Sequence, residues 1–129
     1  MRKKIRSGTK WEEKIAYSRA MRIDNYVVVS GTTSVDAEGN VVGIDDMYGQ
    51  ARFVLQKIAK ALEQCGASPK DVVRTRIFMV DIKRFEEVGK AHKEVFNGID
   101  PATSFVEVSA LLDPRLLVEI EVDAIVGTP

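Results

Sequence analysis

A stretch of alternating apolar and acidic residues near the C-terminus constrains the fold more than any other feature of the sequence. Its acidic positions are Glu119, Glu121 and Asp123, and its apolar positions are Leu116, Val118, Ile120, Val122 and Ala124. Successive side chains of a β-strand point to opposite faces of the sheet. The pattern therefore predicts a strand that buries one apolar face in a core and presents a row of carboxylates on the other face.

The row of carboxylates has two interpretations. Three acids on one strand face repel one another unless they meet water or cations. The face is either solvated, or it lines a cleft in which Glu119 or Glu121 handles a proton or a cationic group. A second strand, expected over residues 72–80, carries Arg74 and Arg76 on one face, and we expect these arginines to form a cross-strand ion-pair ladder with the acids.

The remaining elements alternate between strands and helices. Apolar residues at helical spacing indicate two helices, one that begins at Asp45-Asp46 and ends near Cys65, and one over residues 84–96. The order along the chain predicts a small α+β domain with both helices on one face of the sheet. Further strands are expected over residues 2–6 (either a short strand or a basic arm), over 16–23 and 26–30 as a hairpin across Asp24-Asn25, and within 101–110, joined by a turn to the acidic strand as a second hairpin.

The face of the sheet opposite the helices is expected to carry charged residues together with Phe78 and Phe105. Such a face is either wet or packed against a copy of itself. Because exposed aromatic rings need cover, we expect the chain to form a homo-oligomer.

Composition and charge exclude several classes of function. The 129 residues suffice for one domain, spanning residues 1–129, with its own core. The chain holds 19 basic and 19 acidic side chains, and this balance argues against nucleic acid or an anionic membrane as a partner. Its one cysteine, Cys65, and its one histidine, His92, exclude an internal disulfide and a Cys/His metal site within one chain. We expect no cofactor, and the lack of a signal sequence or an apolar span predicts a cytoplasmic protein.

Two places outside the acidic strand are candidates for a site. Ser30 and Gly31 end a β-branched run, where a small hydroxyl and a glycine either permit close approach of a ligand or simply terminate the strand. His92 lies on the apolar stripe of the second helix, a position that suits either a packing residue or a catalytic histidine.

Three segments of the sequence resemble the RidA/YjgF family, the reactive-intermediate deaminases once described as endoribonucleases of the L-PSP type. They are Tyr17 with the strand that ends at Ser30-Gly31, the segment 73–85 with Val-Arg-Thr-Arg-Ile-Phe, Asp81 and Phe85, and the C-terminal signature from Pro101-Ala102 to Val118-Glu-Ile-Glu. The resemblance implies a chorismate-mutase-like mixed sheet with two helices on one face, assembled as a homotrimer around a central β-barrel. It also implies ligand sites in the clefts between adjacent subunits.

The resemblance further implies a chemistry. Family deaminases hydrolyse 2-imino or enamine acids to 2-keto acids and ammonia, and an arginine holds the substrate carboxylate through two hydrogen bonds. The first glutamate of the Glu-Ile-Glu motif, here Glu119, positions or activates the attacking water. Tyr17, Ser30 and Gly31 line the family pocket by the same correspondence.

This chain departs from the family pattern at the arginine. Thr103 stands where the deaminase motif has Arg, and Phe105 replaces a smaller residue two positions later. A neutral hydroxyl in place of a guanidinium costs several kcal/mol of carboxylate binding. The pattern therefore resembles a branch of the family that lacks the deaminase arginine. Arg19, Arg22 or His92 is a hypothetical replacement for the missing cation.

These observations predict a trimer that binds a small metabolite between subunits and hydrolyses an imine, an enamine or a related substrate with Glu119 as acid or base. The predicted binding residues are Tyr17, Ser30, Gly31, His92, Thr103 and Phe105. The alternative is a non-catalytic trimer that binds a metabolite or another protein. RNA cleavage is disfavoured by the neutral charge and by the lack of a basic, aromatic groove in the sequence.

Overall fold

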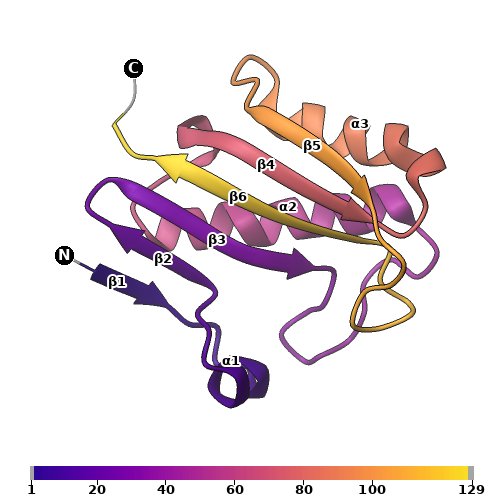
Figure 1. Ribbon diagram of the computed structural model, residues 1–129, viewed down its shortest axis with the longest axis horizontal. Helices are drawn as coiled ribbons and strands as arrows, with labels where there is room; N and C mark the ends of the chain where they lie inside the picture. Colours follow the sequence, from indigo (N-terminus) through magenta and orange to yellow (C-terminus); the bar gives the residue numbers. More distant parts are fainter. Residues whose placement is uncertain (1, 128–129) are drawn as a thin grey trace.

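The computed structural model describes residues 2–127 as one six-stranded sheet with strand order β1-β2-β3-β6-β4-β5 and two long helices packed behind it (Figure 1). Two 3₁₀ turns, Pro69–Asp71 and Ile82–Arg84, precede β4 and α3. The strands and helices are β1 (Arg2–Ile5), α1 (Lys10–Ile15), β2 (Ala20–Ile23), β3 (Tyr26–Thr33), α2 (Met47–Gln64), β4 (Val72–Met79), α3 (Phe85–Phe96), β5 (Ala102–Glu107) and β6 (Val118–Ile125).

The predicted acidic strand is β6, and it lies between β3 and β4 in the sheet. Its apolar side chains are fully buried, whereas the three acids that alternate with them stay partly exposed on the opposite face. Helix α2 packs on β3 and β6, and α3 lies beside α2. The prediction of an α+β domain with both long helices on one face of the sheet is confirmed. The buried set on β6 is Val118, Ile120, Val122 and Ala124.

Helix α2 begins where the acidic pair predicted it. The side chain of Asp46 caps the helix by accepting a hydrogen bond from the N–H of Gly49 at 2.9 Å. One face of α2 is apolar and buried in the core, as its residue spacing predicted. This face comprises Met47, Ala51, Val54, Leu55, Ile58, Ala61 and Leu62.

Removing this cap is expected to weaken the whole fold, because α2 covers the centre of the sheet. Asp46→Ala leaves the N–H of Gly49 without its side-chain acceptor and should lower the free energy of unfolding by about 0.5–2 kcal/mol. Urea denaturation measures the change. Asp46→Asn is the matched control, since asparagine caps as well as aspartate. Equal losses in the two variants would show that the cap itself contributes nothing.

The expected C-terminal hairpin is wrong. Strands β5 and β6 do not pair, because β4 lies between them, parallel to β5 and antiparallel to β6. Helix α3 connects β4 to β5, and such a crossover is what a parallel pair requires. The chain then returns to β6 through residues 108–117, which contain Pro114 and are too long for a tight turn.

The N-terminal expectations are confirmed in part. Residues 2–5 form the strand β1, which pairs with β2, and the turn at Asp24-Asn25 joins β2 to β3. The strand predicted over 16–23 is too long, because only Ala20–Ile23 is extended. The helix α1 was missed; Thr9 caps it by accepting a hydrogen bond from the N–H of Glu12. A Thr-x-x-Glu spacing before a helix is the sequence signal for such a start.

The placement of Phe105 on the charged face of the sheet is also wrong. Parallel pairing aligns Phe105 with Ile77, whose side chain is buried against the helices. Phe105 therefore points to the helix side, where its ring meets the edge of the Phe85 ring at a centroid distance of 6.2 Å. Of the two phenylalanines expected on the charged face, only Phe78 lies there, paired with Glu119.

Among residues 2–127, no helix is long and apolar enough to cross a membrane. The same residues contain no cluster of three or more His, Cys, Asp or Glu side chains that suits a metal ion.

Candidate functional site

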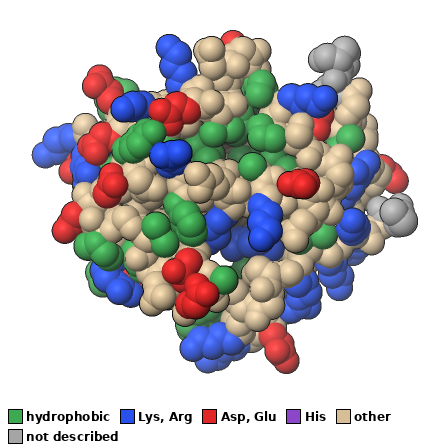
Figure 2. Space-filling view, turned by 180° about the vertical axis from the view of Figure 1, so that it is seen from behind, with side chains coloured by type: hydrophobic (Ala, Val, Ile, Leu, Met, Phe, Trp, Pro, Cys, Tyr) green, Lys and Arg blue, Asp and Glu red, His purple; other side chains and the backbone are tan. Residues whose placement is uncertain are grey.

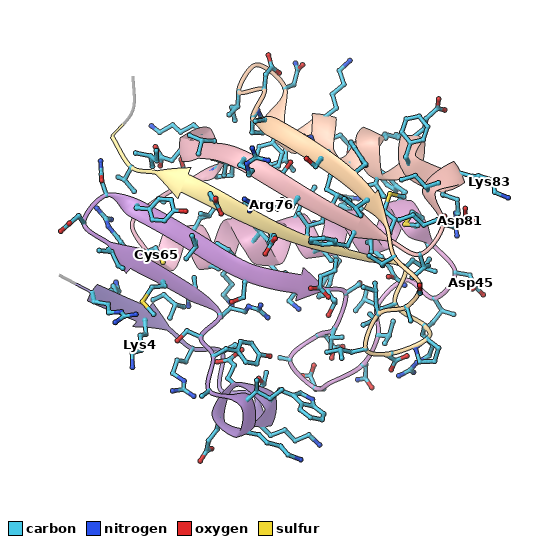
Figure 3. All side chains as sticks on the ribbon, viewed as in Figure 1. Lys4, Asp45, Cys65, Arg76, Asp81 and Lys83 are labelled. Atoms are coloured by element: carbon cyan, nitrogen blue, oxygen red, sulfur yellow. The ribbon has the colours of Figure 1, made fainter. Side chains whose placement is uncertain are left out.

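The acids on the exposed face of β6 divide into two environments. Arg76, labelled on β4 at the middle of the sheet in Figure 3, lies 3.8 Å from Glu121 Oε1 and 3.6 Å from Asp123 Oδ1. The predicted ion-pair ladder is confirmed for these two acids. It contributes little stability, about 0–1 kcal/mol, because all three side chains remain partly exposed. No salt bridge within the described chain joins Glu119 to Arg74 or Arg76.

Glu119 is set apart from the other two acids by its position against Gly31. A Cβ atom at position 31 would overlap the Glu119 carboxylate, so the absence of a side chain there makes room for it. Burial raises the pKa of Glu119 above its ordinary value, the nearby Arg19 guanidinium opposes that rise, and Glu121 adds to it. A half-buried carboxyl group whose protonation is easier than usual is suited to proton transfer.

Arg19 connects the other predicted residues of this region to one another. Its Nη2 donates a hydrogen bond of 2.5 Å to the carbonyl oxygen of Gly31, and its guanidinium lies 5.9 Å from the centre of the Tyr17 ring. Ser30 donates its N–H to the carbonyl of Arg19 and its hydroxyl to the carbonyl of Ser18. We call these five residues the Glu119 group: Tyr17, Arg19, Ser30, Gly31 and Glu119.

An irregularity in the sheet creates the geometry of this group. The pairing of β3 with β6 shifts between Val29 and Thr32, so Ser30 and Gly31 lie within the irregular part of the ladder. Such irregularities re-aim side chains and occur often beside active sites. The expectation that the strand ends at Ser30-Gly31 is wrong, because β3 continues through the irregularity to Thr33.

The close approach at Gly31 predicts the outcome of adding one methyl group there. Gly31→Ala should push the Glu119 carboxylate out of its half-buried position and towards water, because the new Cβ takes the space that the carboxylate fills, and burial is the main cause of the raised pKa. The pKa of Glu119 should then fall towards its ordinary value, which a ¹³C NMR titration of the side-chain carboxyl group measures. Gly89→Ala is the control, since a Cβ at that position meets nothing within 4 Å. An unchanged Glu119 pKa in Gly31→Ala would contradict the proposed contact.

The remaining predicted residues lie on the opposite face of the sheet. Thr103 is exposed on the edge strand β5, and its Oγ1 lies 2.8 Å from Thr75 Oγ1. Thr75 Oγ1 in turn lies 3.0 Å from His92 Nε2. Within one chain the structure therefore does not bring Thr103, Phe105 and His92 together with the Glu119 group. We call this second set, Thr75, His92, Thr103 and Phe105, the β5-edge group.

His92 packs among apolar and hydroxyl groups. Its ring contacts the Phe96 ring at a centroid distance of 4.6 Å, and burial lowers its pKa below the ordinary value. Burial therefore favours the neutral form of His92. Thr75, which sequence analysis did not single out, is fully buried and links His92 to Thr103. The alternation along β4 places Thr75 on the same face as Ile77. Its contacts with His92 and Thr103 depend on how α3 and β5 pack beside β4, which the sequence pattern does not give.

Of the three cations proposed as replacements for the missing arginine, only Arg19 lies close enough to Glu119 to lower the pKa of that carboxyl group. Arg22 donates to the backbone carbonyls of Cys65 and Asp24, at 2.6 and 2.7 Å, and is turned towards the end of α2. His92 belongs to the other face. Sequence analysis missed Lys57, whose Nζ donates to the carbonyls of Thr33 and Val35 and whose pKa burial lowers to about 8. No pattern in the sequence distinguishes this lysine from others on α2.

A surface hollow of about 480 Å³ lies apart from both groups, between α2 and α3. Figure 2 shows the side of the molecule opposite to that in Figure 1, where acidic and basic side chains are interspersed on the left and basic ones are more frequent from the centre towards the lower right. None of the site residues predicted from the sequence lines this hollow. It is lined by Tyr48, Arg52, Gln56, Ala91, Glu94 and Val95.

Comparison with known proteins matches nearly the whole chain. The family model described as Endoribonuclease L-PSP matches residues 9–126. The crystal structure of Rv2704 from Mycobacterium tuberculosis, a member of the YjgF/YER057c/UK114 family, is 48% identical, with a TM-score of 0.89 over 98% of this chain and 100% of that one. The uncharacterised protein SCO2049 of Streptomyces coelicolor is 32% identical over 97% of this chain and 92% of its own length. A RutC family protein of Pyrococcus abyssi, PYRAB12510, is 33% identical over 81% of this chain and 82% of its own length.

Proposed function

Because the chain belongs to the endoribonuclease L-PSP family, also known as the YjgF or RidA family, we propose that it hydrolyses a small imine, enamine or related metabolite, with Glu119 as the acid or base. The ligand binds in clefts between the subunits of a homotrimer. The substrate is not a simple 2-imino acid, since Thr103 offers no charge to hold a carboxylate at that position.

One observation carries this proposal. Among the three acids on the exposed face of β6, only Glu119 forms no ion pair with Arg76, and burial raises the pKa of Glu119. A carboxylate with a purely structural role in the sheet would pair with a cross-strand arginine, as Glu121 does. A desolvated carboxyl group beside a polar cluster is instead the arrangement expected of a catalytic acid or base.

The separation of the two groups supports a site shared between subunits. The Glu119 group lies on the open face of the sheet, and the β5-edge group lies at the outer edge strand, which has a free hydrogen-bonding side. Phe105 and Phe85 remain 37% and 47% exposed in one chain. A neighbouring subunit that covers this edge would bury both rings and bring its own Glu119 group near Thr103.

A panel of imines and enamines, generated enzymatically in the assay, tests the proposal. The panel pairs substrates that carry an α-carboxylate, such as 2-aminoacrylate, with analogues that lack it. We expect the parent protein to turn over the uncharged members faster. We expect Thr103→Arg to shift the preference towards 2-aminoacrylate, because the guanidinium supplies the missing carboxylate partner.

The same panel separates the proposal from its alternative. Sedimentation equilibrium first establishes that the protein assayed is a trimer. A trimer that turns over no member of the panel, as parent or as Thr103→Arg, would favour the non-catalytic protein that binds a metabolite or another protein. A parent that prefers 2-aminoacrylate would show that a cation other than residue 103, with Arg19 the first to examine, holds the carboxylate.

A further inference from the structure

A chain of hydrogen bonds runs from the core to the exposed edge of the sheet. It links His92 Nε2 to Thr75 Oγ1 at 3.0 Å, Thr75 Oγ1 to Thr103 Oγ1 at 2.8 Å, and Thr103 Oγ1 to the carbonyl oxygen of Pro101 at 2.9 Å. Thr75 is fully buried, His92 is half-buried and Thr103 is exposed. The proposed function does not use this chain of contacts beyond placing Thr103 at the cleft.

Counting the available protons determines which group donates in each of these hydrogen bonds. Each threonine hydroxyl has one proton to donate, and the Pro101 carbonyl has none. Thr103 must therefore donate to Pro101, which obliges Thr75 to donate to Thr103. Thr75 then has no proton left for the ring, so His92 must donate from Nε2. If the proton were on Nδ1 instead, Thr75 would have to donate to Nε2, and one of the two contacts of Thr103 would have no proton.

The direction of these hydrogen bonds determines whether Thr103 can donate to a ligand or accept from it. Its single proton is held by Pro101, and one of its two lone pairs accepts from Thr75. What remains for the exposed side is the second lone pair. We propose that Thr103 is a specificity-determining residue that can only accept a hydrogen bond, held in that state by Thr75 and His92 as positioning residues.

This polarity selects the chemical class of the bound group. A ligand nitrogen or oxygen that carries a proton, as in an amine, an ammonium, an imine N–H or a hydroxyl, satisfies the free lone pair. A carboxylate oxygen has no proton and would face the Thr103 oxygen without a hydrogen bond between them. Position 103 is therefore the inverse of an arginine, which only donates. The inference relies on the proposed function for the location of the ligand. The count of protons depends only on the hydrogen bonds and is independent of the proposed function.

The tautomer of the His92 ring reports directly on the direction of these hydrogen bonds. His92 is the only histidine, so a two-bond ¹H–¹⁵N correlation spectrum of a protein without a histidine tag contains one imidazole pattern. We expect the neutral tautomer with the proton on Nε2 in the parent and in Thr75→Ser, which keeps the hydroxyl. We expect Thr75→Val, which has nearly the same shape but no hydroxyl, to gain the Nδ1–H tautomer. The Nδ1–H tautomer in the parent would overturn the proposal, even if the imine panel succeeds.

Two matched probes test the polarity at the surface. n-Butylammonium and butyrate differ in the sign of the end group, and NMR titration follows the methyl and amide signals of Thr103. We expect n-butylammonium to shift these signals and butyrate to leave them unchanged. Apparent affinity for n-butylammonium should fall roughly tenfold in Thr103→Val, the weaker end of what a hydrogen bond to a charged group contributes. Equal shifts with both probes, or no shift with either, would overturn the assignment of Thr103 as a ligand acceptor.

Discussion

Glu119→Gln is expected to remove most of the catalytic activity while leaving the protein folded. The amide keeps the size of the side chain but neither accepts nor releases a proton at this position. General acid–base catalysis by one side chain typically contributes 10²–10⁴-fold, so kcat/KM should fall by about that factor. The measurement is the initial rate with the fastest substrate of the panel, at pH 7 and at equal concentrations of trimer.

The same substitution is expected to stabilise the fold at neutral pH. The folded-state pKa of Glu119 is raised, so the unfolded chain loses this proton at lower pH than the folded protein does. Stability that is present below the ordinary glutamate pKa is therefore lost as the pH rises through the folded-state pKa. Glutamine carries no charge to desolvate, so the melting temperature of Glu119→Gln should exceed that of the parent at pH 7. This difference in melting temperature should vanish below about pH 4, where Glu119 is protonated in both the folded protein and the unfolded chain.

Glu121→Gln is the matched control for both effects. Glu121 lies two residues along the same strand, on the same face, and its carboxylate pairs with Arg76 at 3.8 Å. Its replacement should leave kcat/KM nearly unchanged and should not raise the melting temperature. If Glu121→Gln lost as much activity as Glu119→Gln, the activity would depend on the charge of the whole acidic row and not on one positioned carboxyl group.

The largest loss of stability is expected from Ile120→Ala. Ile120 is fully buried at the centre of β6, paired with Thr32 of β3 and Ile77 of β4 and covered by the helices. Removing three carbons there leaves a cavity that the flanking strands cannot close, and such changes cost about 2–5 kcal/mol. Urea denaturation at a fixed protein concentration measures the loss, because subunit association contributes to the apparent stability.

An isoleucine on the surface provides the comparison. Ile15 is 61% exposed at the end of α1, so Ile15→Ala should change the free energy of unfolding by no more than about 0.5 kcal/mol. Equal effects at positions 15 and 120 would contradict the placement of β6 at the centre of the core.

The elements with a strong period were predictable from the sequence. The alternation along β6 and the helical stripe of α2 each follow from one buried face, and the cap at Asp46 follows from the chemistry of helix ends. The pairing of strands was not predictable in the same way. Alternation along β5 and β6 fits a hairpin as well as it fits two strands separated by β4, because the pattern records which face is buried and not which strand is adjacent.

The candidate site shows the same division. The residue types at Glu119, Ser30 and Gly31 indicated proton transfer and close approach, and the structure brings these residues together. Their convergence depends on the shift in pairing between Val29 and Thr32, which no local pattern encodes. The assignment of Phe105 to the charged face failed because the face of β5 is set by its register with β4, a contact between segments that α3 separates.

The dependence of kcat/KM on pH tests the role of Glu119 most directly. If Glu119 acts as the base, the parent should show a limb that rises with pH, with a midpoint above the ordinary glutamate pKa of 4.5, because burial raises the pKa of this carboxyl group. That limb should be missing from Glu119→Gln. Profiles of the same shape in the parent and the variant, or no turnover by the parent at any pH, would contradict the account.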